Sequence, residues 1–137
     1  MPAGRTPDER SDAREQAVML LYEAEQRSVA ASVLATEREI FSAEVVRGLI
    51  EGVEGAIEEL DAAIVDSARG WALDRMPALD RAILRLAIYE LKSRPEVPVA
   101  VVIDEAVELA KRFSTDDSGR FVNGILATLA RSLRPDA

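Results

Sequence analysis

Cysteine and histidine are both absent from this sequence of 137 residues. Their absence excludes disulfide bonds, zinc sites with thiolate or imidazole ligands, and catalytic groups that depend on a histidine or a cysteine. A chain without cysteine suits a reducing compartment, so we expect a cytoplasmic protein. A magnesium site made only of carboxylates is the metal chemistry that stays open.

Long apolar runs and phosphate-binding glycine loops are also missing. No stretch approaches the length that a membrane-spanning helix needs, and residues 1–14 lack the apolar core of a signal peptide. The glycines at positions 48, 52 and 55 match neither the dinucleotide-binding spacing nor the P-loop spacing. Within a helical pattern they indicate close helix packing, or a helix break near Gly55.

Positive charge is scarce relative to negative charge, and the net charge is −8. Residues 1–30 hold four arginines against six acids (−2), residues 31–70 three against nine (−6), and residues 71–137 ten lysines and arginines against ten acids (0). Proteins that bind nucleic acids on their own usually carry a basic patch. The composition therefore argues against strong, autonomous RNA binding.

Helical periodicity runs along nearly the whole chain. Apolar residues recur at three- and four-residue spacing, which predicts an all-α protein with short connections. The stretches with this period are 17–24, 45–53, 57–68, 79–91, 102–113 and 122–133. The stretch 79–91 is apolar nearly all round and predicts the central helix. Asp12 with Glu15, and Thr36 with Glu39, resemble capping boxes and predict two helix starts.

Acidic residues near the end of the chain form two groups. Asp104, Glu105 and Glu108 are interpreted as a solvated helix face rather than a metal site, because adjacent side chains on a helix diverge. The run at 116–118 (DDS) predicts an N-terminal cap for the last helix and leaves an additional binding role open.

Two aromatic residues have both a structural and a functional interpretation. Phe121 is either a core residue beside Phe113 or a platform for an unpaired base, with Arg120 on a phosphate. Trp71 is the single tryptophan, and it either closes the core or anchors a partner. The sequence pattern alone does not decide between these alternatives.

Four segments together resemble the NusB family of transcription antitermination factors. They are AREQAVMLLYEAE (13–25), DRAILRLAIYEL (80–91), VPVAVVIDEAVELAKRF (97–113) and DDSGRFVNGIL (116–126). They stand in the family's order and at its spacing, and no single segment would suffice. The resemblance implies one NusB-like RNA-binding domain over residues 1–137. Its fold would be an all-α, compact bundle of about seven helices in two packed subbundles, about 11–75 and about 76–137.

The resemblance also implies a function. NusB-like proteins bind the boxA element of nascent ribosomal RNA leaders together with NusE, which doubles as a ribosomal small-subunit protein. The complex joins RNA polymerase with other Nus factors and suppresses premature termination. It catalyses no reaction and needs no cofactor or metal, so the implied role is that of an RNA-binding adaptor.

Carried over by position, the resemblance implies an RNA surface on the first helix and at the starts of the central and last helices. Its members are Arg10 and Arg14 as phosphate contacts, Tyr22, Asp80, Arg81, Asp117, Ser118, Arg120 and Phe121. A NusE footprint is expected around Trp71, Leu73, Arg75 and Met76. Asn123 and Gly124 are expected to allow close packing of the last helix. The assignment requires Arg14 and Phe121 to lie on one ledge for unpaired nucleotides.

One departure from the family bears on the strength of RNA binding. Ser11 and Asp12 interrupt the run of arginines that family members often carry there, leaving Arg5, Arg10 and Arg14. Each lost phosphate contact weakens binding, so we expect weak RNA affinity without NusE, which would supply the missing positive charge. The acidic segment 31–70 is expected to face away from the RNA.

Two other interpretations stay open beside this one. The chain could be a protein–protein scaffold with weak or lost RNA binding, and a homodimer is compatible with the resemblance. The fold also occurs as the RNA-binding domain of a cytosine methyltransferase acting on ribosomal RNA. That enzyme needs a catalytic domain and a nucleophilic cysteine, so it is not favoured for this chain, which has no cysteine.

Overall fold

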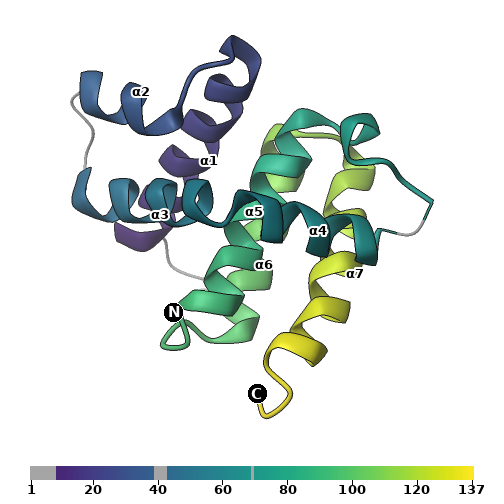
Figure 1. Cartoon of the computed structure of the whole chain (residues 1–137). Helices are drawn as coiled ribbons and strands as arrows, with labels where there is room; N and C mark the ends of the chain where they lie inside the picture. Colours follow the sequence, from purple (N-terminus) through teal and green to yellow (C-terminus); the bar gives the residue numbers. More distant parts are fainter. Residues whose placement is uncertain (1–8, 39–42, 69) are drawn as a thin grey trace.

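The structure is a computed structural model that describes residues 9–38, 43–68 and 70–137 (Figure 1). The helices are α1 (Glu9–Arg27), α2 (Ala31–Glu37), α3 (Ala43–Gly55), α4 (Ile57–Ser67), the short 3-10 helix η1 (Leu73–Arg75), α5 (Ala78–Ser93), α6 (Val99–Phe113) and α7 (Asp116–Leu133). These seven α-helices of the described residues confirm the predicted all-α fold. None of the described helices is long and apolar enough to cross a membrane.

Helix α5 is the centre of the fold, as its apolar sequence predicted. Helices α1, α3, α4, α6 and α7 all pack against it. Ile83, Leu84 and Ile88 are almost completely inaccessible to solvent. Burying an apolar side chain of this size contributes about 1.5–3 kcal/mol, so α5 supplies a large part of the stability of the core.

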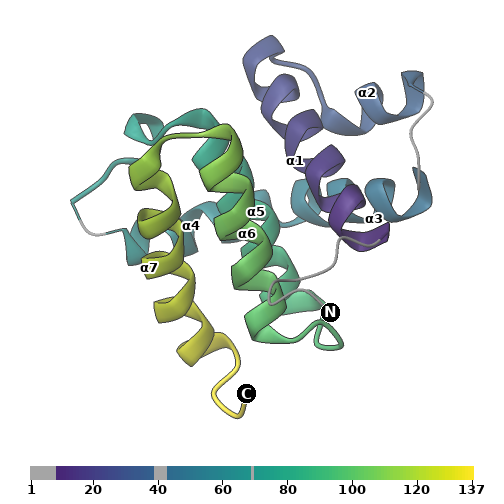
Figure 2. The ribbon, with the colours of Figure 1, turned by 180° about the vertical axis from the view of Figure 1, so that it is seen from behind.

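The other helices surround α5 in two groups. Both views show α5 and α6 between α1 on one side and α7 on the other (Figures 1 and 2). Helices α1, α2 and α3 pack on one another, whereas α4 packs mainly on α5 and α7. The division into subbundles near residue 75 stays a prediction. Because of the packing of α4, we propose that the first subbundle ends with α3.

Both predicted capping boxes of the N-terminal half are wrong. Helix α1 already includes Glu9, so Asp12 lies inside the helix rather than at its cap. Thr36 lies in the last turn of α2, a helix that the apolar pattern did not predict, and its hydroxyl donates to the Ser32 carbonyl at 2.9 Å. A threonine that bonds back within its own helix does not cap the next one. Glu39 lies outside the described residues.

Glycines allow α3 to approach α5 closely. A Cβ atom at Gly52 would overlap the ring of Tyr89, and one at Gly48 would lie 3.3 Å from the guanidinium of Arg94. Gly55 has open space around it and is the last residue of α3. Close packing is thus confirmed at the first two glycines, and a helix break is confirmed at the third.

Candidate functional site

The start of α7 is capped by Thr115. Its Oγ1 accepts a hydrogen bond from the backbone N–H of Ser118 at 3.2 Å, and its own N–H donates to Ser118 Oγ at 3.3 Å. Asp116 and Asp117 lie in the first helical turn, where negative charge favours the positive end of the helix dipole. The predicted cap is therefore confirmed in position, but the N-cap residue is Thr115. Residues 116–118 are the first residues of the helix, and Ser118 completes the capping box from there.

Asp80 joins this turn to α5. Its Oδ1 accepts a hydrogen bond from Ser114 Oγ at 2.7 Å, and its Oδ2 accepts one from Ser118 Oγ at 2.9 Å. Asp80 and Ser118 are both buried. Because their polar atoms already bond to each other, these two residues position the start of α7. The expected RNA contacts of Asp80 and Ser118 are corrected to this structural role, because both side chains are buried.

An aromatic groove of about 240 Å³ lies between the connector 70–77 and the start of α7. Its lining residues are Trp71, Met76, Pro77, Asp80, Thr115, Asp117, Ser118 and Phe121. The rings of Trp71 and Phe121 lie edge to face, with centroids 6.0 Å apart and an interplanar angle of 60°. Trp71 is 52% exposed, so it does not close the core. Phe121 is half-buried at the edge of the core, and its ring packs against that of Trp71.

Arg120 lies next to this groove and is accessible. Its Nη2 is 2.5 Å from Oδ1 of Asp117, and both side chains are 84% exposed. An exposed ion pair of this kind contributes only about 0–1 kcal/mol. The guanidinium can therefore exchange Asp117 for a phosphate at little cost.

Arg14 occupies the opposite kind of environment. It is 4% exposed, and its guanidinium donates to both carboxylate oxygens of Glu90 at 2.7 and 2.9 Å and to Glu105 at 3.0 Å. This junction joins α1 to α5 and α6. The expected phosphate contact of Arg14 is therefore corrected to a structural role. The interpretation of Glu105 as part of a solvated face is wrong for the same reason.

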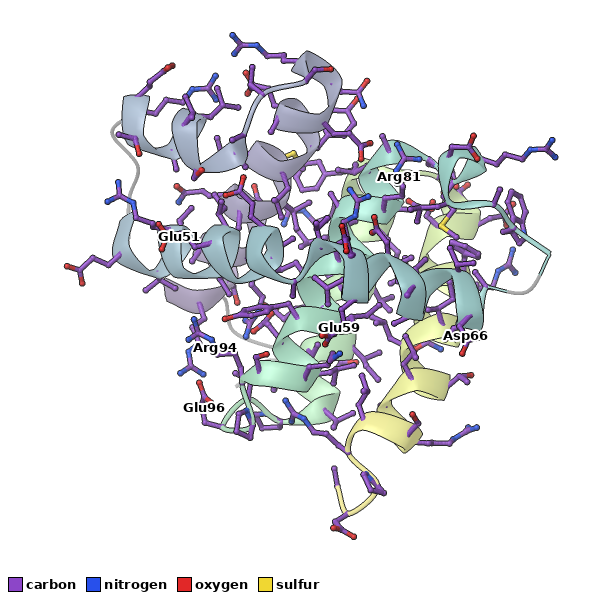
Figure 3. The ribbon with its side chains drawn as sticks, in the orientation of Figure 1. Glu51, Glu59, Asp66, Arg81, Arg94 and Glu96 are labelled. Carbon is purple, nitrogen blue, oxygen red and sulfur yellow. The ribbon has the colours of Figure 1, made fainter. Side chains whose placement is uncertain are left out.

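Arg10 is exposed but lies far from the aromatic groove. It lines a small cleft with Arg94 and Val97 at the C-terminal end of α5, whereas the groove lies at the N-terminal end of α5. The 16 residues of α5 separate its ends by about 22 Å. Figure 3 shows Arg81 and Arg94 at these opposite ends. The expected single ledge is therefore not formed, because α5 and α6 separate α1 from α7 (Figure 2).

Arg81 points into the protein rather than towards a ligand. Its guanidinium pairs with Glu25 of α1 and donates to the carbonyl oxygens of Leu73 at 3.1 Å and Met76 at 2.6 Å. Burial raises the pKa of Glu25, but hydrogen bonds from Arg81 and Arg85 outweigh this and lower the pKa below its ordinary value. The expected contact of Arg81 with RNA is corrected to an internal role.

The remaining predicted residues differ in accessibility. Tyr22 is exposed on α1, and Arg75 is exposed on η1, with Leu73 half-buried beside it. Met76 is buried and contributes to the groove wall. The NusE footprint around these connector residues stays a prediction.

The end of α6 carries an aromatic residue whose exposure the sequence pattern did not predict. Phe113 is 40% exposed, and the guanidinium of Arg112 lies 4.6 Å from its ring centroid. The helical period placed Phe113 on the buried face. Phe113 is, however, the last residue of α6. A position at the end of a predicted helix is therefore the sequence signal that could have indicated its exposure.

The last helix is open to solvent at Asn123 and Gly124. Asn123 is exposed, and a Cβ atom at Gly124 would meet nothing within 4 Å. The expectation that these two residues allow close packing is therefore wrong.

These features define a small all-helical protein with a groove suited to a flat ring and an exposed arginine beside it. The family model of the NusB family matches residues 11–131, and the chain belongs to this family. The resemblance inferred from the sequence is thereby confirmed.

Named relatives agree with this assignment. The transcription antitermination protein NusB of Saccharopolyspora erythraea is 49% identical over 128 residues, which cover 88% of this chain and 86% of the relative. The protein of the same name from Streptomyces avermitilis is 46% identical over 135 residues, covering 92% and 93%.

Solved structures of the family share the fold. NusB of T. maritima superposes with a TM-score of 0.83 at 34% identity, covering 93% of both chains. A crystal structure of the antitermination factors NusB and NusE in complex with double-stranded RNA gives a TM-score of 0.80 at 26% identity, covering 90% of this chain and 96% of the other.

Proposed function

We propose that this chain is a transcription antitermination factor that binds the boxA element of ribosomal RNA leaders together with NusE. The complex helps RNA polymerase, with other Nus factors, to resist premature termination. The role is that of an adaptor in the cytoplasm, where the transcript is made. It requires no catalysis and no cofactor.

The aromatic groove is the observation that carries the proposed RNA binding. Unpaired bases stack on aromatic side chains, at about 1–3 kcal/mol per base. The groove offers Trp71 and Phe121 to such a base, and its volume of about 240 Å³ far exceeds the ~10–15 Å³ that one water molecule needs. Arg120, on the rim, would contact the adjoining phosphate.

NusE is the proposed source of the positive charge that this chain lacks. The chain has a net charge of −8, and Arg14 is engaged inside the protein. A structural relative is a complex of NusB with NusE and double-stranded RNA. We propose that NusE contacts the connector around Leu73 and Arg75, beside Trp71 and outside the groove lining.

Binding of labelled boxA RNA, measured by fluorescence anisotropy with and without NusE, tests this function. NusE should tighten binding by the wild-type chain. Phe121→Ala should weaken binding about 5- to 150-fold, which corresponds to the loss of one stacked base. A duplex of the same sequence should compete poorly, because its bases are paired and cannot enter the groove.

A matched control is Val33→Ala, which shortens an exposed apolar residue on α2, away from α7 in both views. It should leave RNA affinity unchanged. Wild-type affinity of a folded Phe121→Ala variant would contradict the groove as the RNA site. Equal affinity with and without NusE would contradict the cooperative part of the proposal.

The scaffold without RNA binding is a second candidate, and the burial of Arg14 favours it. Among the arginines predicted to contact RNA, Arg10 and Arg120 are the exposed ones, and substituting both by alanine distinguishes the two functions. If the variant still brings boxA RNA into a complex with NusE at wild-type affinity, the scaffold is favoured. Light scattering of the same samples measures whether the chain forms a homodimer with or without RNA.

A further inference from the structure

The connector 70–77 holds one wall of the aromatic groove, yet little of it is regular structure. Within it, η1 covers only Leu73–Arg75. Trp71 precedes η1, and Met76 follows it. The position of Trp71 relative to Phe121 therefore depends on what fixes the backbone of these few residues.

Backbone hydrogen bonds hold part of the connector, from Trp71 N–H to the Ala68 carbonyl at 2.9 Å and from Met76 N–H to the Leu73 carbonyl at 3.2 Å. Arg81 adds side-chain contacts to the same backbone. Its Nη1 donates to the carbonyl oxygens of Leu73 at 3.1 Å and Met76 at 2.6 Å, at the two ends of η1. Its other guanidinium nitrogens bond to the carboxylate of Glu25 on α1. One guanidinium group on α5 thus bonds to both the connector and α1. The planar guanidinium of arginine has several donors in a fixed arrangement and can make these contacts together, whereas the compact ammonium group of lysine cannot.

Arg85 provides an internal comparison. It lies one turn further along α5, its side chain is 15% exposed against 13% for Arg81, and it pairs with the same Glu25 at 2.8 Å. Its remaining hydrogen bonds go to the carboxylate of Asp61 on α4, at 2.7 and 3.0 Å. Two similar arginines therefore share one carboxylate, but Arg81 donates to connector carbonyls and Arg85 donates to a second carboxylate.

We propose that Arg81 is a positioning residue that holds the connector so that Trp71 stays against Phe121 and the groove is preformed for a base. The base-binding part of this inference rests on the proposed function. The positioning part does not, because it concerns the free protein. A preformed groove avoids the cost of ordering the connector on binding, so loss of Arg81 should weaken RNA affinity without removing any residue that contacts the base.

The single tryptophan makes the position of the connector measurable, since all tryptophan emission of this chain comes from Trp71. Arg81→Lys should shift this emission, raise its quenching by iodide, and weaken boxA affinity about 3- to 10-fold in the presence of NusE. Arg85→Lys should leave emission, quenching and affinity as in the wild type. Circular dichroism and urea unfolding establish that both variants are folded. Glu25→Gln is a second variant, and it should change Trp71 in the same direction but less.

The outcomes separate the inference from the proposed function. The inference is overturned if a folded Arg81→Lys variant has the same Trp71 emission and quenching as the wild type. It is also overturned if Arg85→Lys changes the emission and quenching as much as Arg81→Lys does. Altered emission with wild-type RNA affinity also overturns it, provided that Phe121→Ala lowers the affinity. If Phe121→Ala leaves the affinity unchanged as well, the proposed function fails, while the emission still decides whether Arg81 positions the connector.

Discussion

The starts of α1 and α7 both carry an arginine that the family resemblance assigned to RNA, and the structure gives them opposite environments. Arg14 is buried between Glu90 and Glu105, which lie on two other helices. Arg120 pairs with Asp117, three residues before it, and stays exposed. The burial of the partners makes the difference. The carboxylates that pair with Arg14 are themselves buried, whereas Asp117 is 84% exposed, so its ion pair with Arg120 stays at the surface.

The largest effect is expected from Arg14→Ala. This change leaves two buried carboxylates without their cation, and breaking a buried ion pair in this way costs about 3–5 kcal/mol. Urea unfolding should show this loss. Arg120→Ala, the control at the other helix start, should stay within about 0.5 kcal/mol of the wild type. If the two variants have similar free energies of unfolding, the two arginines do not differ in their contribution to stability, which would contradict the comparison.

Gly52→Ala tests the packing of α3 on α5 near the buried junction. The new Cβ atom would overlap the Tyr89 ring, so the ring or the helix must move, at a cost of about 1–3 kcal/mol. RNA affinity of the folded fraction should be unchanged, because Gly52 lies away from the groove. Gly55→Ala is the matched control and should change the free energy of unfolding by less than about 1 kcal/mol, since nothing lies within 4 Å.

Thr115→Ala tests the region of the groove. It removes the side-chain acceptor of the capping box, which should cost about 1 kcal/mol of stability. Because the cap also fixes the turn that carries Phe121, RNA affinity should fall a few-fold. Thr115→Ser keeps the hydroxyl and should retain both properties. Equal behaviour of the alanine and serine variants would show that the hydroxyl does not hold the start of α7.

The smallest effect concerns the surface of α1. Hydrogen bonds from Arg38 and Arg27 lower the pKa of Glu23 from 4.5 to about 2. A lowered pKa in the folded state stabilises the protein above pH 4.5, and this contribution is lost as the pH falls from 4.5 towards 2.

Glu23→Gln should therefore lose less stability than the wild type on acidification through this range. Arg38→Gln, which removes the main partner, should behave in the same way. Urea unfolding at several pH values measures both. If the free energy of unfolding of the variants falls as steeply with decreasing pH as that of the wild type, the role of this ion pair is contradicted.

The long helices were predictable from the sequence because their apolar period is strong. Helices α5, α6 and α7 match the expected stretches, and the break at Gly55 was also indicated. Helix α2 was not predicted. It is seven residues long, and Thr36 near its end was interpreted as the start of the next helix. Short helices with few apolar residues depend on tertiary packing, which a local pattern does not contain.

The candidate site was predictable only in part. Phe121 lines an open groove and Arg120 is exposed, so the RNA contacts that the resemblance implied for them stay predictions. The burial of Arg14 depends on residues 76 and 91 positions away, so no local signal could reveal it. The same holds for Arg81, whose partner Glu25 is 56 positions away.

Photo-cross-linking of boxA RNA that carries 4-thiouridine, with NusE present, tests the central claim most directly. Mass spectrometry of the cross-linked peptides locates the bases on the chain. The groove predicts cross-links to Trp71 and Phe121, in the connector and the first turns of α7. Cross-links confined to residues 10–22 of α1 would contradict it.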